Sequence, residues 1–342
     1  MIDLLYGAVA GLALVLFLLV ATIVIGRLRS DARRRRERAL RPRIEAAIAE
    51  YLSGDDPEPP ALPPSSEGQQ LLRTVGLETL VELRGGERSR LIELLERSGV
   101  VAHTAFELTS RRRRVRRAAA EALAQMNGAD AAEWLRFGIR HRDAEVRLSC
   151  AAGLAEVADG DTAEVLAIAD RFAIDRPGAA AAIVLTLGRR SPEALADGLA
   201  PTASDELRRL STAVVGVLRL ADHAPLLRAA LAGDDDELVA RSARGLGNIG
   251  DVESVDELLA LTDDPNRPWF VHLAATSALG AIGDPRAATA LERELEADNW
   301  LLQSKAAGAL KLLGRVGEER LKHALSSPVE TVRAHAKVAL ES

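Results

Sequence analysis

From residue 67 onward, apolar residues recur at helical spacing, and the helices themselves recur. One leucine returns every 28 to 33 residues: Leu123, Leu154, Leu187, Leu218, Leu246, Leu279, Leu310 and Leu340. Eight positions before each leucine stands an apolar residue, and four positions before it a mostly small one. These spacings place all three positions on one helix face. The pattern predicts one amphipathic helix in each repeating unit, with room for neighbouring helices to approach closely.

Each unit also carries signals for a corner and a second helix. Four residues past the repeat leucine stand Asn127, Gly250, Gly283 and Gly314, which are residue types able to end a helix in the left-handed conformation. Ser191-Pro192 and Asp284-Pro285 are typical of the start of the helix that follows. The second helices have their own leucines, as in VDELLALTDD (255–264) and TALERELEAD (289–298). Two such helices cannot bury their apolar faces alone, so the units are expected to stack into a solenoid.

Four stretches carry a family resemblance: VRRAAAEALAQM (115–126), VRLSCAAGLAEVADGD (146–161), ARGLGNIGDVESVDELLAL (243–261) and SALGAIGDPRAATALERELEAD (277–298). They resemble HEAT repeats, in particular the short bacterial repeats related to those of phycobilisome lyases. The resemblance covers roughly residues 67–342 and implies an all-α, armadillo-like solenoid with a right-handed superhelix. It implies HEAT-like repeats at 110–342 and an N-terminal helical cap at 67–109. Residues 178–205 depart from the pattern because they lack the Val-Arg start and the glycine corner.

The N-terminus predicts a membrane span. Residues 4–25 carry no charge over 22 positions, enough for a helix to cross a hydrocarbon layer of about 30 Å. A signal peptide would begin with basic residues, whereas Asp3 precedes this stretch and arginines follow it. We therefore expect one uncleaved transmembrane helix within residues 1–26. With the repeats behind it, this outline resembles membrane-anchored bacterial HEAT proteins.

The segment after the span is strongly basic. Residues 27–43 contain nine arginines against Asp31 and Glu37. Because positive charge beside a span marks its cytoplasmic side, we expect the N-terminus outside a bacterial inner membrane and residues 27–342 in the cytoplasm. Arginines are also attracted to anionic lipid headgroups. The arginines placed there are Arg27, Arg29, Arg33, Arg34, Arg35 and Arg36. A nucleic-acid-binding arm is the alternative, but residues 44–342 have a net charge of −12 (35 basic, 47 acidic), which disfavours contact with phosphate backbones.

Two short segments connect the basic stretch to the repeats. A helix in IEAAIAEYLSG (44–54) completes the basic juxtamembrane region at 27–54, and DDPEPPALPPSS (55–66) follows it. Five prolines in these twelve positions predict a semi-rigid, extended linker. This linker would hold the repeats away from the bilayer.

The chemistry-bearing residues form no recognisable catalytic set. The single cysteine, Cys150, excludes an internal disulfide and occupies a small repeat position, so it is expected to be a buried filler. None of the six histidines is followed by glutamate, which disfavours the paired His-Glu steps of a HEAT-type di-iron hydroxylase. No phosphate-binding loop, H-E-x-x-H or G-x-S-x-G motif is present. We expect no enzyme activity, cofactor or metal, and we interpret the acidic runs at 159–161 and 233–237 as solvated corners.

Two groups of residues are candidates for contact with a partner. Arg111, Arg112, Arg113 and Arg114 begin a repeat helix, where positive charge opposes the helix dipole. They are either an anion or acidic-partner patch or solvated neighbours of the arginine usual in these repeats. Trp269 and Trp300 stand ten positions before successive repeat leucines, with Phe270 beside the first. They either form an aromatic docking row, since tryptophan is enriched at binding hot spots, or fill inter-repeat corners.

The combined features favour a membrane-anchored cytoplasmic scaffold that binds a protein partner and holds it at the bilayer. Two alternatives remain open at this point. One is a bilin lyase or isomerase activity, which some relatives with these repeats possess. The other is a structural subunit of a cell-envelope complex, for example one that makes or exports polysaccharide.

Overall fold

The computed structural model describes residues 24, 27, 35–54, 66–157 and 161–341. The predicted membrane span at 4–25 lies outside the described residues except for Val24, and the proline-rich linker at 55–66 lies outside them except for Ser66, which begins a helix. Arg29, Arg33 and Arg34 are also not described. Within the described ranges, no helix has both the length and the apolar character needed to cross a bilayer.

The chain divides into two compact units, Met1–Leu135 and Arg136–Ser342. In the first unit, residues 35–53 form one helix, which includes arginines as well as most of the helix predicted at 44–54. Arginine is a good helix former whose charge stays in solvent. Ile44, Ile48 and Tyr51 form its buried face. The other helices are α2 (Ser66–Glu82), α3 (Gly85–Arg97), α4 (Val100–Glu107) and α5 (Arg113–Met126), while α6 (Ala129–Gly138) crosses the boundary between the units.

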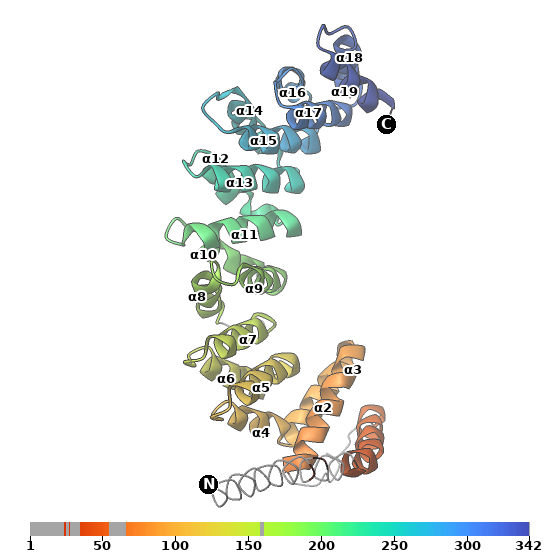
Figure 1. Ribbon diagram of the computed structural model, residues 1–342, viewed down its shortest axis with the longest axis vertical. Coiled ribbons are helices and arrows are strands. Elements are labelled where there is room, and N and C mark those ends of the chain that lie inside the picture. The colour runs from red at the N-terminus through yellow and green to blue at the C-terminus, as the bar shows by residue number, and fades with distance from the viewer. Residues whose placement is uncertain (1–23, 25–26, 28–34, 55–65, 158–160, 342) are drawn as a thin grey trace, which may run out of the picture. The chain divides into compact units, whose positions relative to one another are not determined.

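The second unit is a stack of helical pairs (Figure 1). One layer contains α7 (Ala144–Ala155), α9 (Pro177–Arg190), α11 (Asp205–Leu218), α13 (Asp236–Ile249), α15 (Trp269–Ile282), α17 (Trp300–Leu312) and α19 (Glu330–Glu341). The other contains α8 (Thr162–Phe172), α10 (Leu195–Leu199), α12 (Ala224–Leu231), α14 (Val255–Asp263), α16 (Ala288–Leu295) and α18 (Arg315–Ala324). Each first-layer helix packs on the next one in its layer, and each second-layer helix packs on the first-layer helix that follows it. The second unit is therefore an all-α helical repeat stack, as the sequence pattern predicts.

Short 3-10 turns lead into four of the second-layer helices, at Pro192–Ala194, Ala221–His223, Val252–Ser254 and Pro285–Ala287. At the last of these, Asp284 Oδ1 accepts a hydrogen bond from the backbone N–H of Arg286 at 2.8 Å. This is the capping that the Asp-Pro pair predicts. Ser191, the other predicted cap, makes no such side-chain bond to the turn that follows it.

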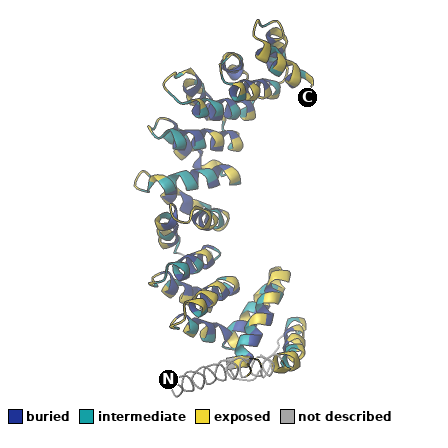
Figure 2. Cartoon of the chain, viewed as in Figure 1, coloured by how far each residue is buried: buried dark blue, intermediate teal, exposed yellow. Residues whose placement is uncertain are grey.

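The repeat leucines form much of the core. Leu123, Leu154, Leu187, Leu246, Leu279 and Leu310 are each at most 4% exposed. Leu218 and Leu340 are only half-buried, because Leu218 is the last residue of α11 and Leu340 lies in the final described helix. Figure 2 shows the buried residues concentrated where the helices face one another.

Close contacts between successive first-layer helices depend on glycine. A Cβ atom at Gly247 would lie 2.9 Å from Cβ of Ala278, and one at Gly280 would lie 2.5 Å from Cβ of Ala309. Both glycines directly follow a repeat leucine, and both alanines directly precede one. Small residues at these two positions set how closely the repeats pack.

The corners are mostly as predicted. Asn127, Gly250 and Gly283 have φ values of 33°, 80° and 77° in the left-handed region and cap α5, α13 and α15. Gly314 differs, because its φ of 63° and ψ of −137° place it just before α18 rather than in a left-handed cap. The corner after α11 is formed by Arg219, with φ 55° and ψ 45°. Arginine has no preference for this conformation, so the sequence pattern gave no sign of it.

Candidate protein-docking groove

A groove with a volume of about 740 Å³ opens in the second unit. Its lining comes from the end of α14, the loop at 264–268, the start of α15, and α16 with the corner that follows it. The volume lies within the range of about 300–1,000 Å³ that is usual for binding clefts. We call this feature the tryptophan groove, because Trp269 forms part of its wall.

The loop on one side of the groove is fixed by Arg267. Its Nη1 donates to Asp236 Oδ1 at 2.8 Å, and its Nη2 donates to the carbonyl oxygen of Gly233 at 2.9 Å. Asp236 and Arg267 are 31 residues apart, so the bond joins equivalent regions of adjacent repeats. Asp264 Oδ1 also accepts a hydrogen bond from the backbone N–H of Asn266 at 3.0 Å. These bonds order the loop before any partner arrives, which lowers the entropy lost on binding.

His272 connects the loop to α16 beneath the groove. Its Nδ1 lies 3.0 Å from Glu294 Oε1, and its Nε2 lies 3.0 Å from the carbonyl oxygen of Asp264. The Glu294 side chain is only 5% exposed. The hydrogen bond to Glu294 raises the pKa of His272 above its usual value, although burial works in the opposite direction. Since both contacts are made to acceptors, the imidazolium form satisfies both and the neutral form only one.

The two tryptophans occupy equivalent, exposed positions. Trp269 is the first residue of α15 and is 51% exposed, while Trp300 is the first residue of α17 and is 69% exposed. Trp269 makes an edge contact with Phe270, with 6.3 Å between the ring centroids. About half of the Trp269 side chain is covered and Trp300 is more exposed, so the docking role of both residues stays a prediction.

The backbone beside Trp300 is also held firmly. Asn299 caps α17 by accepting hydrogen bonds from the N–H groups of Leu301 at 3.0 Å and Leu302 at 3.3 Å. Gln303 Nε2 donates to the carbonyl oxygen of Ala297 at 2.8 Å. Two exposed acidic residues at this corner, Glu296 and Asp298, belong to the groove lining. Within the described part of the chain, neither of these two takes part in an ion pair, whereas Arg293 is paired with Asp263.

The arginine cluster at 111–114 lies in the first unit, around the start of α5, and all four residues are exposed. The buried arginine of this repeat is Arg116, whose Nη1 donates to the carbonyl oxygens of Ser110 at 3.0 Å and Arg111 at 3.2 Å. Arg147 and Arg333 bond the carbonyl oxygens five and six residues before them in the same way. Arg116 thus fixes the preceding loop through carbonyl groups. Arg117 pairs with Glu121 at 2.7 Å.

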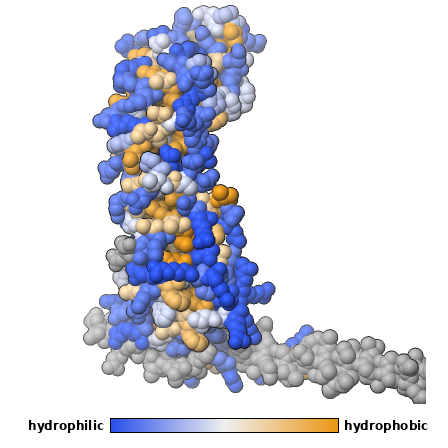
Figure 3. All heavy atoms as spheres, turned by 90° about the vertical axis from the view of Figure 1, so that its left-hand side faces the viewer, coloured by the Kyte–Doolittle hydropathy of each residue, from blue (hydrophilic) through white to orange (hydrophobic). Residues whose placement is uncertain are grey.

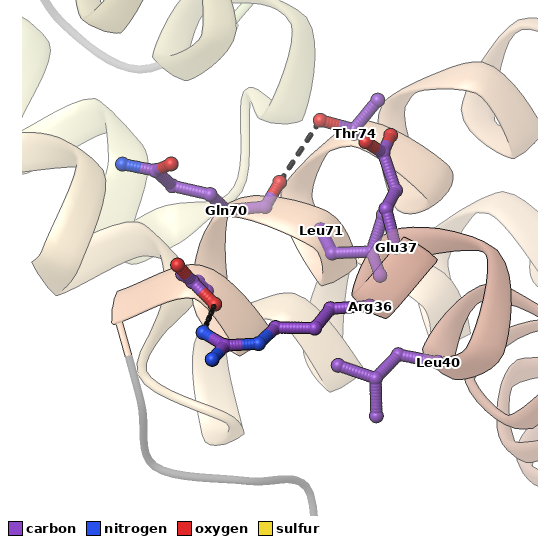
Figure 4. Close-up of a pocket in the computed structure, with 7 residues that line it drawn as sticks. Arg36, Glu37, Leu40, Gln70, Leu71 and Thr74 are labelled. Atoms are coloured by element: carbon purple, nitrogen blue, oxygen red, sulfur yellow. Dashed lines mark hydrogen bonds and ion pairs between the residues drawn. The ribbon is translucent and has the colours of Figure 1, made fainter. Parts of the chain in front are cut away.

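Three of the arginines expected at the lipid surface are among the described residues. Arg27 and Arg35 are exposed, and Arg36 is exposed beside Glu67, with Nη1 3.5 Å from Oε2. Arg36 lines a small pocket between the helix at 35–53 and α2, which Figure 4 shows. The pocket has a volume of about 70 Å³. The adjacent Arg41 pairs with Glu45 at 2.8 Å and with Glu78 of α2. The helix at 35–53 is thus tied to α2 by ion pairs.

Cys150 is fully buried, and burial raises the pKa of its thiol to about 12. Its Sγ lies so close to Gly138 that a Cβ atom there would be 2.3 Å away. These properties match the buried-filler interpretation. Within the described ranges, no three His, Cys, Asp or Glu residues are grouped as metal ligands would be.

Two family models match parts of the chain. The model described as HEAT repeats matches residues 224–311, which contain the tryptophan groove, and the model described as PBS lyase HEAT-like repeat matches residues 115–141. Comparison with the sequences of curated proteins gives no match.

Among solved structures, the fold is similar to that of Kap121p. The crystal structure of Kap121p bound to Nup53p gives a TM-score of 0.52 at 12% identity, over 81% of this chain and 37% of that one. The complex of Kap121p with Ste12p gives 0.53 at 11% identity, over 89% and 41%. The chain therefore spans about two fifths of the length of Kap121p. Human deoxyhypusine hydroxylase in complex with glycerol matches at a TM-score of 0.31 and 20% identity, over 89% and 96%. At these identities the Kap121p matches establish the helical-repeat fold alone.

Proposed function

We propose that this helical repeat protein is a membrane-anchored scaffold that binds a protein partner through its stacked repeats and holds the partner at the bilayer. The observation that carries the proposal is the pair of exposed tryptophans at equivalent positions on α15 and α17, of which Trp269 lines a groove. Large aromatic side chains are costly to leave in water and are the residues most often found at binding hot spots.

The repeat architecture supports a binding role. Each helical repeat contacts mainly the repeats next to it, which leaves a long surface relative to the mass of the protein. The structures with a similar fold include Kap121p bound to Nup53p and to Ste12p. For this chain, we extend that likeness to the binding of a protein partner.

The membrane part of the proposal depends on sequence. The uncharged residues 4–25 and the arginines that follow them are typical of a single span whose C-terminal side is cytoplasmic. Anchoring raises the effective concentration of a captured partner near the bilayer without any new contact. The localisation that we propose is a bacterial inner membrane, with the repeats in the cytoplasm.

The test is crosslinking in intact cells followed by detergent extraction and affinity capture. Three forms are compared: the natural chain, a chain lacking residues 4–25, and the double variant Trp269→Ala, Trp300→Ala. We expect the natural chain to sediment with membranes, the truncated chain to leave them, and the double variant to stay there but lose its crosslinked partner.

A natural chain that does not sediment with membranes would exclude the anchor. A partner recovered in fixed stoichiometry after stringent washing would instead favour the structural subunit of an envelope complex. Incubation of the purified chain with a bilin tests the lyase alternative, because a shift in visible absorption would reveal binding of the tetrapyrrole.

A further inference from the structure

The net negative charge of the second unit lies in one stretch of its sequence. Residues 251–300 contain eleven acidic residues and three arginines, a net charge of −8. The rest of the unit, residues 136–250 and 301–342, contains 21 acidic and 21 basic residues and is balanced. The negative charge of the unit therefore originates in the stretch that forms α14, α15, α16 and the groove between them.

Within the groove, the basic side chains already have acidic partners. Arg267 is paired with Asp236, Arg293 with Asp263, and His272 with Glu294. The carboxylates of Glu296 and Asp298 are left exposed to solvent, without an ion pair among the described residues. A ligand that enters the groove therefore meets two uncompensated negative charges and an aromatic wall.

The groove lining contains both hydrophobic and charged residues. Pro265, Trp269, Ala297 and Leu302 supply apolar surface to its lining. Figure 3 shows hydrophobic residues along the stacked repeats of the second unit, flanked by hydrophilic ones. Lysine and arginine side chains match such a surface, because their methylene stems cover apolar groups while the charged ends reach carboxylates. A guanidinium or ammonium group is also attracted to the face of an indole ring.

We propose that the tryptophan groove binds an extended, lysine- and arginine-rich segment of the partner protein. Trp269 stacks on its basic side chains, and Glu296 and Asp298 pair with their charges. The capped corner at 296–299 and the tethered loop at 264–268 hold these groups in place before binding. This inference rests on the proposed scaffold function and specifies the chemistry of what the scaffold recognises.

The test uses the full chain in nanodiscs of zwitterionic phosphatidylcholine, so that the lipid itself does not attract the probe. The probe is a fluorescein-labelled nonapeptide, Gly-Lys-Arg-Gly-Arg-Lys-Gly-Lys-Arg, and its control has Glu and Asp in place of the basic residues. Fluorescence anisotropy measures binding at about physiological salt. In a Trp134→Phe background, only Trp269 and Trp300 remain, and their emission reports contact with the probe directly.

Two matched pairs of variants separate the groove from the overall charge. The double variant Glu296→Lys, Asp298→Lys and the control Glu253→Lys, Glu257→Lys change the net charge equally, and Glu253 and Glu257 are exposed outside the groove. We expect the first to raise the Kd at least about tenfold and the second less than about threefold. Trp269→Ala should weaken binding by about 30-fold, in the range of a hot-spot residue, whereas Phe106→Ala, at an exposed aromatic side chain of the first unit, should leave binding unchanged.

Several outcomes would overturn the inference. These are equal losses in the two charge-reversed variants, binding of the acidic peptide as tight as that of the basic one, and no change in tryptophan emission on binding. A synthetic peptide of residues 27–43 is a further competitor for the probe. If it displaces the probe at a tenfold lower concentration than the unlabelled nonapeptide does, the inference is also overturned, because the groove would then be filled by this chain itself. If the partner captured in cells is retained by the Glu296→Lys, Asp298→Lys variant, the groove assignment fails while the scaffold function stands. If no partner is captured by the natural chain, the scaffold function fails.

Discussion

His272 and Glu294 join two segments 22 residues apart, with Nδ1 of the histidine 3.0 Å from the buried carboxylate. Because Nε2 faces the carbonyl oxygen of Asp264 at 3.0 Å, the imidazolium ion holds the loop before Trp269 against α16. The groove wall therefore depends on a titratable contact.

This contact predicts a pH dependence of stability. The pKa of His272 is raised in the fold, so its contribution is fully present below the unfolded value of about 6.5 and is lost as the pH rises through the higher folded value. We expect the melting temperature of the natural chain to exceed that of His272→Gln most at low pH, and this difference to shrink as the pH rises above about 6.5. An equal difference between the two proteins at every pH would contradict the assignment of a charged histidine.

The exposed tryptophans should contribute little to stability. Replacing both Trp269 and Trp300 with alanine should leave the melting temperature nearly unchanged, because both side chains are largely in solvent. Leu279→Ala is the contrasting variant, since Leu279 is fully buried and a Leu→Ala change in a core costs about 2–5 kcal/mol. A large loss in the tryptophan variant, seen by thermal or urea unfolding, would return these residues to a core-filling role.

Two glycines of neighbouring helices should respond oppositely to the same change. At Gly280, the added Cβ would lie 2.5 Å from Cβ of Ala309, so Gly280→Ala should destabilise the fold by about 1–3 kcal/mol. At Gly308, on the exposed face of α17, no atom lies within 4 Å of the added Cβ. Gly308→Ala should therefore stabilise the fold by about 0.5–1 kcal/mol through the better helix propensity of alanine. Urea denaturation measures the free energy of unfolding of both variants, which should change in opposite directions.

The left-handed corners predict another pair of opposite effects. Gly283→Ala places a Cβ at a φ of 77° and should cost about 1 kcal/mol. Arg219 already has a φ of 55°, so Arg219→Gly should relieve strain and be neutral or stabilising by up to about 1 kcal/mol. A clear loss of stability in Arg219→Gly would mean that the arginine side chain contributes more than its backbone conformation costs.

Ion pairs reinforce the register of the repeats. Arg176 pairs with Glu145 at 2.6 Å, Arg286 with Asp256 at 2.7 Å and Arg320 with Glu292 at 2.7 Å. In each pair the arginine lies 28 to 31 residues after its acidic partner, so the bond joins adjacent repeats. These pairs are partly exposed, and such pairs typically contribute less than about 1 kcal/mol each. Because of their regular spacing, these pairs mainly favour one alignment of each repeat on the next, and they add little to the overall stability.

The sequence by itself determined the local features of this protein. The recurring leucines predicted the helical repeats, and Asn127, Gly250 and Gly283 predicted where helices end, because these features depend on spacing within one helix and on the conformation allowed to one residue. The small-residue slot likewise predicted that Cys150 is buried. The equivalence of Trp269 and Trp300 was also visible, because it follows from their distance to a repeat leucine.

Only the tertiary structure decided what these residues touch. That both tryptophans are exposed, that Glu294 reaches His272, and that Glu296 and Asp298 face a groove depends on how one repeat is rotated against the next. The same holds for the contact of Gly280 with Ala309 and for the loop carbonyls bound by Arg116. Periodicity gives the face on which a side chain lies, but the partner on that face comes from another repeat, about 30 residues away in sequence.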